Sequence, residues 1–223
     1  MSRTRIKICG LRHPEQVAAV AAAGADAVGL VFYPPSPRSI DVRQAAALLR
    51  ELPPFVTSVG LFVDPSVQQV EQTLSGVPLG LLQFHGDETA DFCAAFGLPY
   101  IKAIKIEVGG TAEQASQRCN DTMNAHPQAQ GFLLDSSVVG ASGGTGKTFD
   151  WQQVPAEFWS KVILAGGLGP GNVADAVTRY RPYAVDVSSG VESAPGEKDP
   201  ARVREFIEAV RRADARLKIE TPV

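Results

Sequence analysis

The sequence predicts an α/β protein, built as a single-domain (β/α)8 barrel of residues 1–223. Eight short runs rich in Val, Ile and Leu alternate with amphipathic stretches, and no long linker or low-complexity segment divides the chain. Eight strand–helix units in 223 residues fit a closed barrel. A doubly wound open sheet is the alternative, but such a sheet more often stops at five or six strands.

The apolar runs are the predicted strands, because each is short and rich in β-branched residues. In chain order they cover residues 5–9, 27–32, 56–62, 79–84, 100–106, 131–135, 161–166 and 184–189. In such a barrel the active-site groups come from the carboxyl ends of the strands, and phosphate is held near the seventh and eighth strands.

The stretches between the runs carry the apolar spacing of helices. Apolar side chains recur at i, i+3, i+4 and i+7 in two clear sets, Val173–Ala176–Val177–Tyr180 and Val203–Phe206–Ile207–Val210. Helix starts are predicted at Asp64-Pro65 and Asp199-Pro200, since a capping residue followed by proline is typical of the first helical turn.

Composition bounds the partners and the compartment. A hydrophobic content of 44%, a charged content of 20% and a net charge of −3 suit one soluble domain, and that charge is too near neutral to indicate nucleic acid as a partner. No apolar stretch is long enough to span a bilayer, and "MSRTRIKICG" has no signal-peptide core. We therefore expect a cytoplasmic protein without a membrane partner, as a monomer or weak homodimer.

The three cysteines, Cys9, Cys93 and Cys119, are few, odd in number and widely spaced. They form neither a disulfide framework nor a metal site, so no metal is expected. Cys93 and Cys119 lie in helix-like segments and are interpreted as small packing residues.

The segment "ASGGTGKTFDW" (141–151) is similar to a nucleotide-binding phosphate loop. Such a loop needs its first glycine five places before Gly146, where Ala141 stands instead. Asp150 looks like the cap of the element that follows. The nucleotide hydrolase interpretation is therefore weak, and the segment is either a set of backbone N–H groups that face an anion or a Gly-rich surface loop.

Unusual residues close the predicted strands. Cys9 ends the first, Arg38 follows the second in "YPPSPRSI", His85 follows the fourth in "QFHGDE", and Asp135 ends the sixth. The seventh opens into "AGGLGPGNV" and the eighth into "DVSSGVE". Each residue has an ordinary interpretation: an inert cysteine, a surface arginine, a hydrogen-bonded core histidine and a helix-capping aspartate. Their gathering on one rim argues against all four together.

Side chains alternate along a strand, so Lys7 and Cys9 share one face of the first strand while Ile6 and Ile8 share the other. In a barrel the aliphatic pair faces the helices, which leaves Lys7 and Cys9 pointing inward. A thiol beside an ammonium group is expected to have a lowered pKa.

These residues carry a resemblance to the phosphoribosylanthranilate isomerases, the (β/α)8 enzymes of tryptophan biosynthesis. It covers nearly the whole chain, with no departure at a functional position. The matching blocks are "KICG" (7–10), "GLVFYPPSPR" (29–38), "VGLFV" (59–63), "LLQFHGDE" (81–88), "LLD" (133–135), "GGTGKTFDW" (143–151), "LAGGLGPGNV" (164–173) and "VDVSSGVESAPGEKD" (185–199).

The resemblance implies an Amadori rearrangement of an aminoaldose phosphate to an aminoketose phosphate. It implies Asp135 as the general acid that opens the sugar ring and Cys9 as the general base at C2. The two groups need environments that push their pKa values apart. It implies no cofactor, because the substrate's own nitrogen is the electron sink.

The resemblance also implies the binding groups. Arg38 is expected to bind the anthranilate carboxylate, and Asp186 and His85 to contact the substrate. Phosphate is expected on backbone N–H groups after the seventh and eighth strands, at Gly166, Gly167, Ser189 and Gly190, with Gly144 helping to close the site.

Two rivals remain beside the nucleotide hydrolase. The histidine-pathway isomerase performs the same chemistry. By resemblance, that family uses two catalytic aspartates, one of them at the end of the first strand, where this chain has Cys9. A non-catalytic phosphate-binding barrel would need neither Cys9 nor Asp135.

Overall fold

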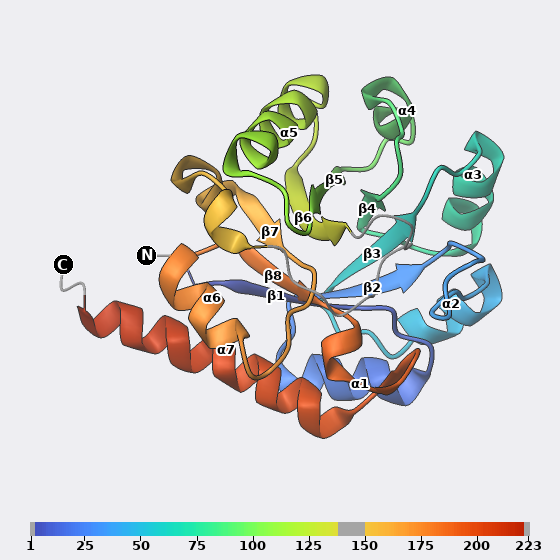
Figure 1. Ribbon diagram of the computed structural model, residues 1–223. Coiled ribbons are helices and arrows are strands. Elements are labelled where there is room, and N and C mark those ends of the chain that lie inside the picture. Colours follow the sequence, from blue (N-terminus) through green and yellow to red (C-terminus); the bar gives the residue numbers. More distant parts are fainter. Residues whose placement is uncertain (1–2, 138–149, 221–223) are drawn as a thin grey trace.

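Eight parallel strands form a closed barrel in the order β1 to β8, in a computed structural model that describes residues 3–137 and 150–220 (Figure 1). The barrel prediction is confirmed. The strands are β1 (Arg5–Cys9), β2 (Ala27–Val31), β3 (Thr57–Phe62), β4 (Leu81–Phe84), β5 (Tyr100–Glu107), β6 (Gly131–Ser137), β7 (Val162–Leu164) and β8 (Ala184–Val187).

Helices cover the outside of the barrel (Figure 1). They are α1 (Pro14–Ala23), α2 (Val42–Leu49), α3 (Val67–Gly76), α4 (Ala90–Ala94), α5 (Ala112–Ala125), α6 (Val173–Tyr180) and α7 (Pro200–Glu220). After β8 a 3-10 turn, η3 (Ser189–Val191), leads into a hairpin of β9 (Glu192–Ala194) and β10 (Glu197–Lys198).

The connection between β6 and β7 differs from the predicted strand–helix unit. Its described part, from residue 150 on, contains two 3-10 helices, η1 (Trp151–Gln153) and η2 (Ala156–Lys161), in place of an α-helix. Pro155 explains the interruption, because proline lacks an N–H group and holds Val154 in an extended conformation. Asp150 does cap η1, accepting a hydrogen bond from Gln152 N at 3.0 Å.

One of the two predicted helix starts is confirmed and the other is wrong. Asp199 accepts from Ala201 N at 2.8 Å and caps α7. By contrast, α3 begins at Val67 with Ser66 as its cap. Ser66 and Gln69 bond reciprocally to each other's backbone N–H groups, so this capping box outcompetes Asp64. Asp64 instead lies in the left-handed region, with a φ of 44°.

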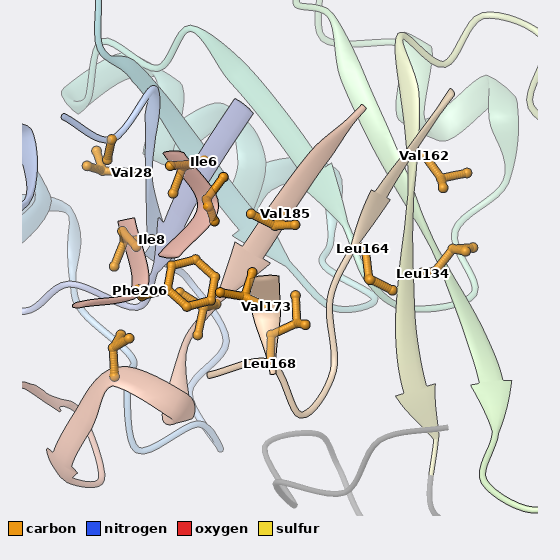
Figure 2. Close-up of a cluster of buried hydrophobic side chains, with 14 of the residues drawn as sticks. Ile6, Ile8, Val28, Leu134, Val162, Leu164, Leu168, Val173, Val185 and Phe206 are labelled. Carbon is orange, nitrogen blue, oxygen red and sulfur yellow. The ribbon is translucent and has the colours of Figure 1, made fainter. Parts of the chain in front are cut away.

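Two cores lie on the two sides of the strand wall. Figure 2 shows the outer core, where Ile6 and Ile8 of β1 lie with Val173 of α6 and Phe206 of α7. A smaller cluster lines the inside, formed by Ile101, Ala103, Leu133, Ile163, Ala165 and Ala184. Fully burying each large aliphatic side chain contributes roughly 1.5–3 kcal/mol. The aliphatic face of β1 therefore turns to the helices, as predicted.

The barrel closes where the first and last strands pair. Lys7 of β1 is in register with Asp186 of β8. On the outside, Asp214 of the long helix α7 accepts from the N and Oγ1 of Thr4, both at 2.8 Å. The closing seam therefore joins the two ends of the sequence and places the carboxyl end of β1 beside that of β8.

Cys93 in α4 and Cys119 in α5 are both fully buried. Both belong to the outer core, so their interpretation as packing residues is confirmed.

Candidate active site

Cys9 ends β1 at the mouth of the barrel. Its side chain is buried and lies in register with Gly29 of β2. A Cβ atom at position 29 would stand 2.5 Å from the Cys9 sulfur, so the missing side chain of Gly29 leaves room for the thiol. Two residues earlier, Lys7 Nζ donates to Asp186 Oδ1 at 3.0 Å, and both side chains are buried.

The expected lowering of the Cys9 pKa is wrong. Burial raises the pKa of the thiol, and although the Lys7 ammonium works against it, the pKa stays above its ordinary value. Burial would lower the pKa of Lys7, but the Asp186 carboxylate and Cys9 outweigh it and raise that pKa. The Lys7 ammonium therefore keeps its proton beside a thiol that ionises less readily than an exposed cysteine.

Asp135 lies in β6, two residues before the strand ends at Ser137, and its carboxyl group has two hydrogen-bond partners. Ser136 N donates to its Oδ1 at 2.8 Å, and His85 Nε2 lies 3.1 Å from its Oδ2. His85 in turn is held by Gln83, whose Nε2 lies 3.2 Å from His85 Nδ1. If the Gln83 amide donates to Nδ1, the imidazole hydrogen lies on Nε2 and points at Asp135.

His85 therefore contacts Asp135, and its predicted contact with the substrate stays a prediction. Gln83, which holds it, is fully buried inside the barrel and was missed by the sequence analysis. Its only local signal is a polar residue on an inward strand position.

Arg38 follows β2 and reaches over the end of β1. A Cβ atom at Gly10 would lie 2.6 Å from Arg38 Cδ, which places the arginine next to Cys9. Its Nε and Nη2 atoms donate to the two carboxylate oxygens of Glu192 in β9, each at 2.8 Å. This two-point bond, opposed in part by burial, raises the pKa of Arg38.

Glu192 is the second residue that the sequence analysis missed. Its side chain is 5% exposed and also accepts from Lys198 Nζ of β10 at 2.6 Å. Burial alone would raise the pKa of Glu192, but Arg38 and Lys198 outweigh it and lower that pKa. Lys198 further donates to Ser188 O at 3.1 Å, and Ser188 Oγ donates to Cys9 O at 3.0 Å.

The predicted phosphate residues lie at the ends of β7 and β8. Gly166 and Gly167 both have positive φ values, 77° and 66°. Their N–H groups, and those of Ser189 and Gly190, donate to no acceptor among the described residues. A Cβ atom at Gly166 would lie 2.8 Å from Asp135 Oδ1, so this turn adjoins the carboxylate. Gly144 lies outside the described residues.

The rim therefore carries three kinds of group: the carboxyl of Asp135 and the thiol of Cys9, a guanidinium beside the thiol, and open N–H donors beside the carboxyl. A buried thiol and a hydrogen-bonded carboxyl on one rim can move protons at two positions of one ligand. Unpaired N–H groups at two adjacent strand ends suit an anion such as phosphate.

Comparison with known proteins gives one family. Residues 6–209 match the model of the family described as "N-(5'phosphoribosyl)anthranilate (PRA) isomerase". The N-(5'-phosphoribosyl)anthranilate isomerase of Pseudomonas fluorescens is 52% identical over 214 residues, which cover 96% of this chain and 99% of that protein.

Solved structures agree with this match. Phosphoribosyl anthranilate isomerase from Thermotoga maritima is 36% identical with a TM-score of 0.79, over 93% of this chain and 98% of that one. A phosphoribosyl anthranilate isomerase in complex with reduced 1-(o-carboxyphenylamino)-1-deoxyribulose 5-phosphate is 34% identical with a TM-score of 0.76, over the same shares. These matches, together with the barrel and the residues at its rim, show that the chain belongs to the family of N-(5'-phosphoribosyl)anthranilate isomerases.

Proposed function

We propose that the chain converts N-(5-phosphoribosyl)anthranilate to 1-(o-carboxyphenylamino)-1-deoxyribulose 5-phosphate, with Asp135 as the general acid and Cys9 as the general base. Family membership supports the reaction. The single observation that carries the residue roles is the position of both groups toward the carboxyl ends of their strands, Cys9 as the last residue of β1 and Asp135 two residues before the end of β6, in one closed barrel.

The steps follow from the groups present. The Asp135 carboxyl gives its proton to the ring oxygen, the bond from C1 to that oxygen breaks, and the nitrogen lone pair forms an iminium ion. The Cys9 thiolate then removes the proton from C2, and the released electrons neutralise the iminium nitrogen. The resulting enolamine becomes the ketone when C1 gains a proton and the C2 hydroxyl loses one. The substrate's nitrogen is the electron sink throughout.

Lys7 supports the base. Its ammonium favours the thiolate form of Cys9, and its own charge is held by Asp186. Asp186 therefore holds Lys7 in place, and its predicted contact with the sugar stays a prediction. His85 and Ser136 hold the acid, since both bond to its oxygens.

The binding groups complete the proposal. Arg38 takes the aromatic carboxylate of the substrate, which is a planar anion suited to a guanidinium fork. The N–H groups of Gly166, Gly167, Ser189 and Gly190 take the phosphate. Support comes from the relative whose solved structure holds a reduced ketose phosphate with a carboxyphenyl group.

The direct test is to follow the loss of anthranilate-type fluorescence from freshly made substrate. Cys9→Ala and Asp135→Asn should each lower kcat by about 10²- to 10⁴-fold, because each removes one proton-transfer group. Cys93→Ala is the matched control, since that thiol is buried in the outer core, and it should keep its activity. A Cys9→Ala variant with most of its activity would place the base elsewhere.

We also propose the cytosol as the location, supported by three free, buried thiols. Among residues 3–137 and 150–220, no helix is both long and apolar enough to cross a membrane. The monomer or weak homodimer and the single domain of residues 1–223 stay predictions.

A further inference from the structure

Arg38 has already spent part of its hydrogen-bonding capacity on the protein. A guanidinium carries five N–H donors, one on Nε and two on each Nη. Glu192 takes the Nε donor and one Nη2 donor, each at 2.8 Å. Nη1 donates to none of the described residues. The outer edge of the guanidinium, formed by Nη1 and the second Nη2 donor, therefore stays open for a second carboxylate.

Glu192 is itself fixed. Lys198 Nζ bonds to its Oε1 at 2.6 Å, and Arg202 Nη1 donates to its backbone oxygen. The side chains of Lys198 and Glu192 are only 1% and 5% exposed. If Glu192 released Arg38, its buried carboxylate would lose the two Arg38 hydrogen bonds with almost no water to replace them, which is costly in a buried site. Glu192 is thus part of a rigid support rather than a counterion that a ligand displaces.

The net charge of the cluster also favours an anion at Arg38. Arg38 and Lys198 carry two positive charges, and Glu192 carries one negative charge, so the cluster has a surplus of one positive charge. Lys198 is almost wholly enclosed, whereas Arg38 is 14% exposed. Of the two positive side chains, Arg38 is therefore the one that an incoming anion can reach to neutralise the surplus positive charge.

We propose that Glu192 is a positioning residue that clamps the inner edge of Arg38, so that the outer edge meets the substrate's aromatic carboxylate end-on. The guanidinium then lies between two carboxylates, one from the β9–β10 hairpin and one from the substrate. This inference rests on the proposed role of Arg38 as the group that binds this carboxylate. It assigns specificity for the carboxylate to the hairpin as well as to Arg38.

The test compares two substrates, N-(5-phosphoribosyl)anthranilate and N-(5-phosphoribosyl)aniline, which lacks the carboxylate. The measured quantity is the ratio of their kcat/KM values, which we call the carboxylate preference. Arg38→Ala should abolish the preference. Glu192→Gln, which loses the charge and one acceptor oxygen, should reduce it by about tenfold or more, chiefly through KM for the anthranilate substrate.

Glu197→Gln is the matched control. Glu197 lies in the same hairpin and pairs with His13 at 3.1 Å, but its side chain is 44% exposed and has no contact with Arg38 among the described residues. The carboxylate preference of the Glu197→Gln variant should equal that of the unmodified protein. In the Arg38→Ala background, Glu192→Gln should have little further effect, because there is no guanidinium left to position.

Each other outcome overturns a distinct claim. A higher carboxylate preference in Glu192→Gln would make Glu192 a competitor of the substrate, and a preference equal to that of Glu197→Gln would give Glu192 no role. An intact preference in Arg38→Ala would remove the proposed role of Arg38 and the clamp with it. If Glu192→Gln does not fold, Glu192→Asp keeps the charge but shortens the reach, and an unchanged preference there overturns the clamp.

Discussion

In the proposed reaction Cys9 has to ionise, although its side chain is buried away from water. Burial raises its pKa, and the Lys7 ammonium only partly offsets that effect. A buried thiol that stays neutral at rest is protected from oxidation and alkylation, since the thiolate is the reactive form. The cost is that only a minor fraction of the free protein carries the proposed base in its ionised form at neutral pH.

The raised pKa predicts a steep pH dependence of Cys9 alkylation. Below its pKa, the thiolate fraction rises about tenfold per pH unit, so inactivation by iodoacetamide should accelerate by that factor between roughly pH 7 and 9. Mass spectrometry of the modified protein should locate the label at Cys9. A bound product analogue should slow the labelling. An inactivation rate that levels off below pH 8 would mean that the pKa of Cys9 is lowered after all.

Sequence reasoning at this scale found residues but not their neighbours. Cys9 ends β1, Asp135 lies near the end of β6 and Arg38 follows β2, so the barrel alone makes them candidates. Glu192 stands out in no local pattern, and Gln83 stands out only as a polar residue on an inward strand position. Their importance comes from folding, which gives Glu192 a partner 154 residues away and encloses Gln83 in the barrel interior. The wrong prediction of a lowered Cys9 pKa has a similar origin. The sequence shows that Lys7 is near Cys9, but it does not show how deeply folding buries the thiol.

Helix α6 ends in a conformation that its sequence does not favour. Arg181 occupies the C-cap with φ and ψ both 52°, in the left-handed region, and its N–H donates to Val177 O at 3.1 Å. Glycine is the usual residue there, because a Cβ atom in this conformation costs roughly 1–2 kcal/mol. The Arg181 side chain is exposed, so its removal should sacrifice little packing.

Arg181→Gly should therefore stabilise the protein by about 0.5–1 kcal/mol, the relieved strain being partly offset by the greater freedom of glycine in the unfolded chain. The measurement is the midpoint of urea unfolding at an unchanged m-value. Arg181→Ala removes the same side chain but keeps the strain, so it should show no such gain. Equal gains in both variants would show that the charge, and not the backbone, is responsible.

Most elements were predictable because their signals are local. The eight strands follow from short apolar runs rich in β-branched residues, and the apolar faces of α6 and α7 follow from their helical spacing. The boundaries that failed depend on competition between neighbouring residues: Ser66 and Gln69 outcompete Asp64, and Pro155 divides the segment before β7. Such contests are decided by small differences in hydrogen bonding, which spacing does not reveal.

The whole molecule keeps two further thiols away from water. Burial raises the pKa of Cys93 to about 12 and that of Cys119 to about 11, from an ordinary 9.0. Above pH 9 the unfolded chain releases these protons while the folded chain retains them. The stability that goes with the neutral thiols is therefore fully present below about pH 9 and is lost as the pH rises toward the folded values.

Alkaline unfolding should reveal this linkage. Between about pH 9 and 11, each thiol should steepen the fall of the unfolding free energy by at most about 1.4 kcal/mol per pH unit. Urea unfolding of the unmodified protein and of the Cys93→Ala/Cys119→Ala double variant should give curves that converge as the pH rises, because the variant starts lower but falls less steeply. Parallel curves would mean that the folded protein lets these thiols ionise freely.

The seam between β1 and β8 also decides when in its synthesis the chain becomes able to work. Lys7 and Asp186 are 179 residues apart, as are Cys9 and Ser188, so neither contact can form until the eighth strand has left the ribosome. In a nascent chain that ends after β7, Cys9 lacks the hydrogen bond from Ser188 to its backbone oxygen, and Lys7 lacks the Asp186 carboxylate. The contacts that support Cys9 therefore form only after seven of the eight barrel strands have been synthesised.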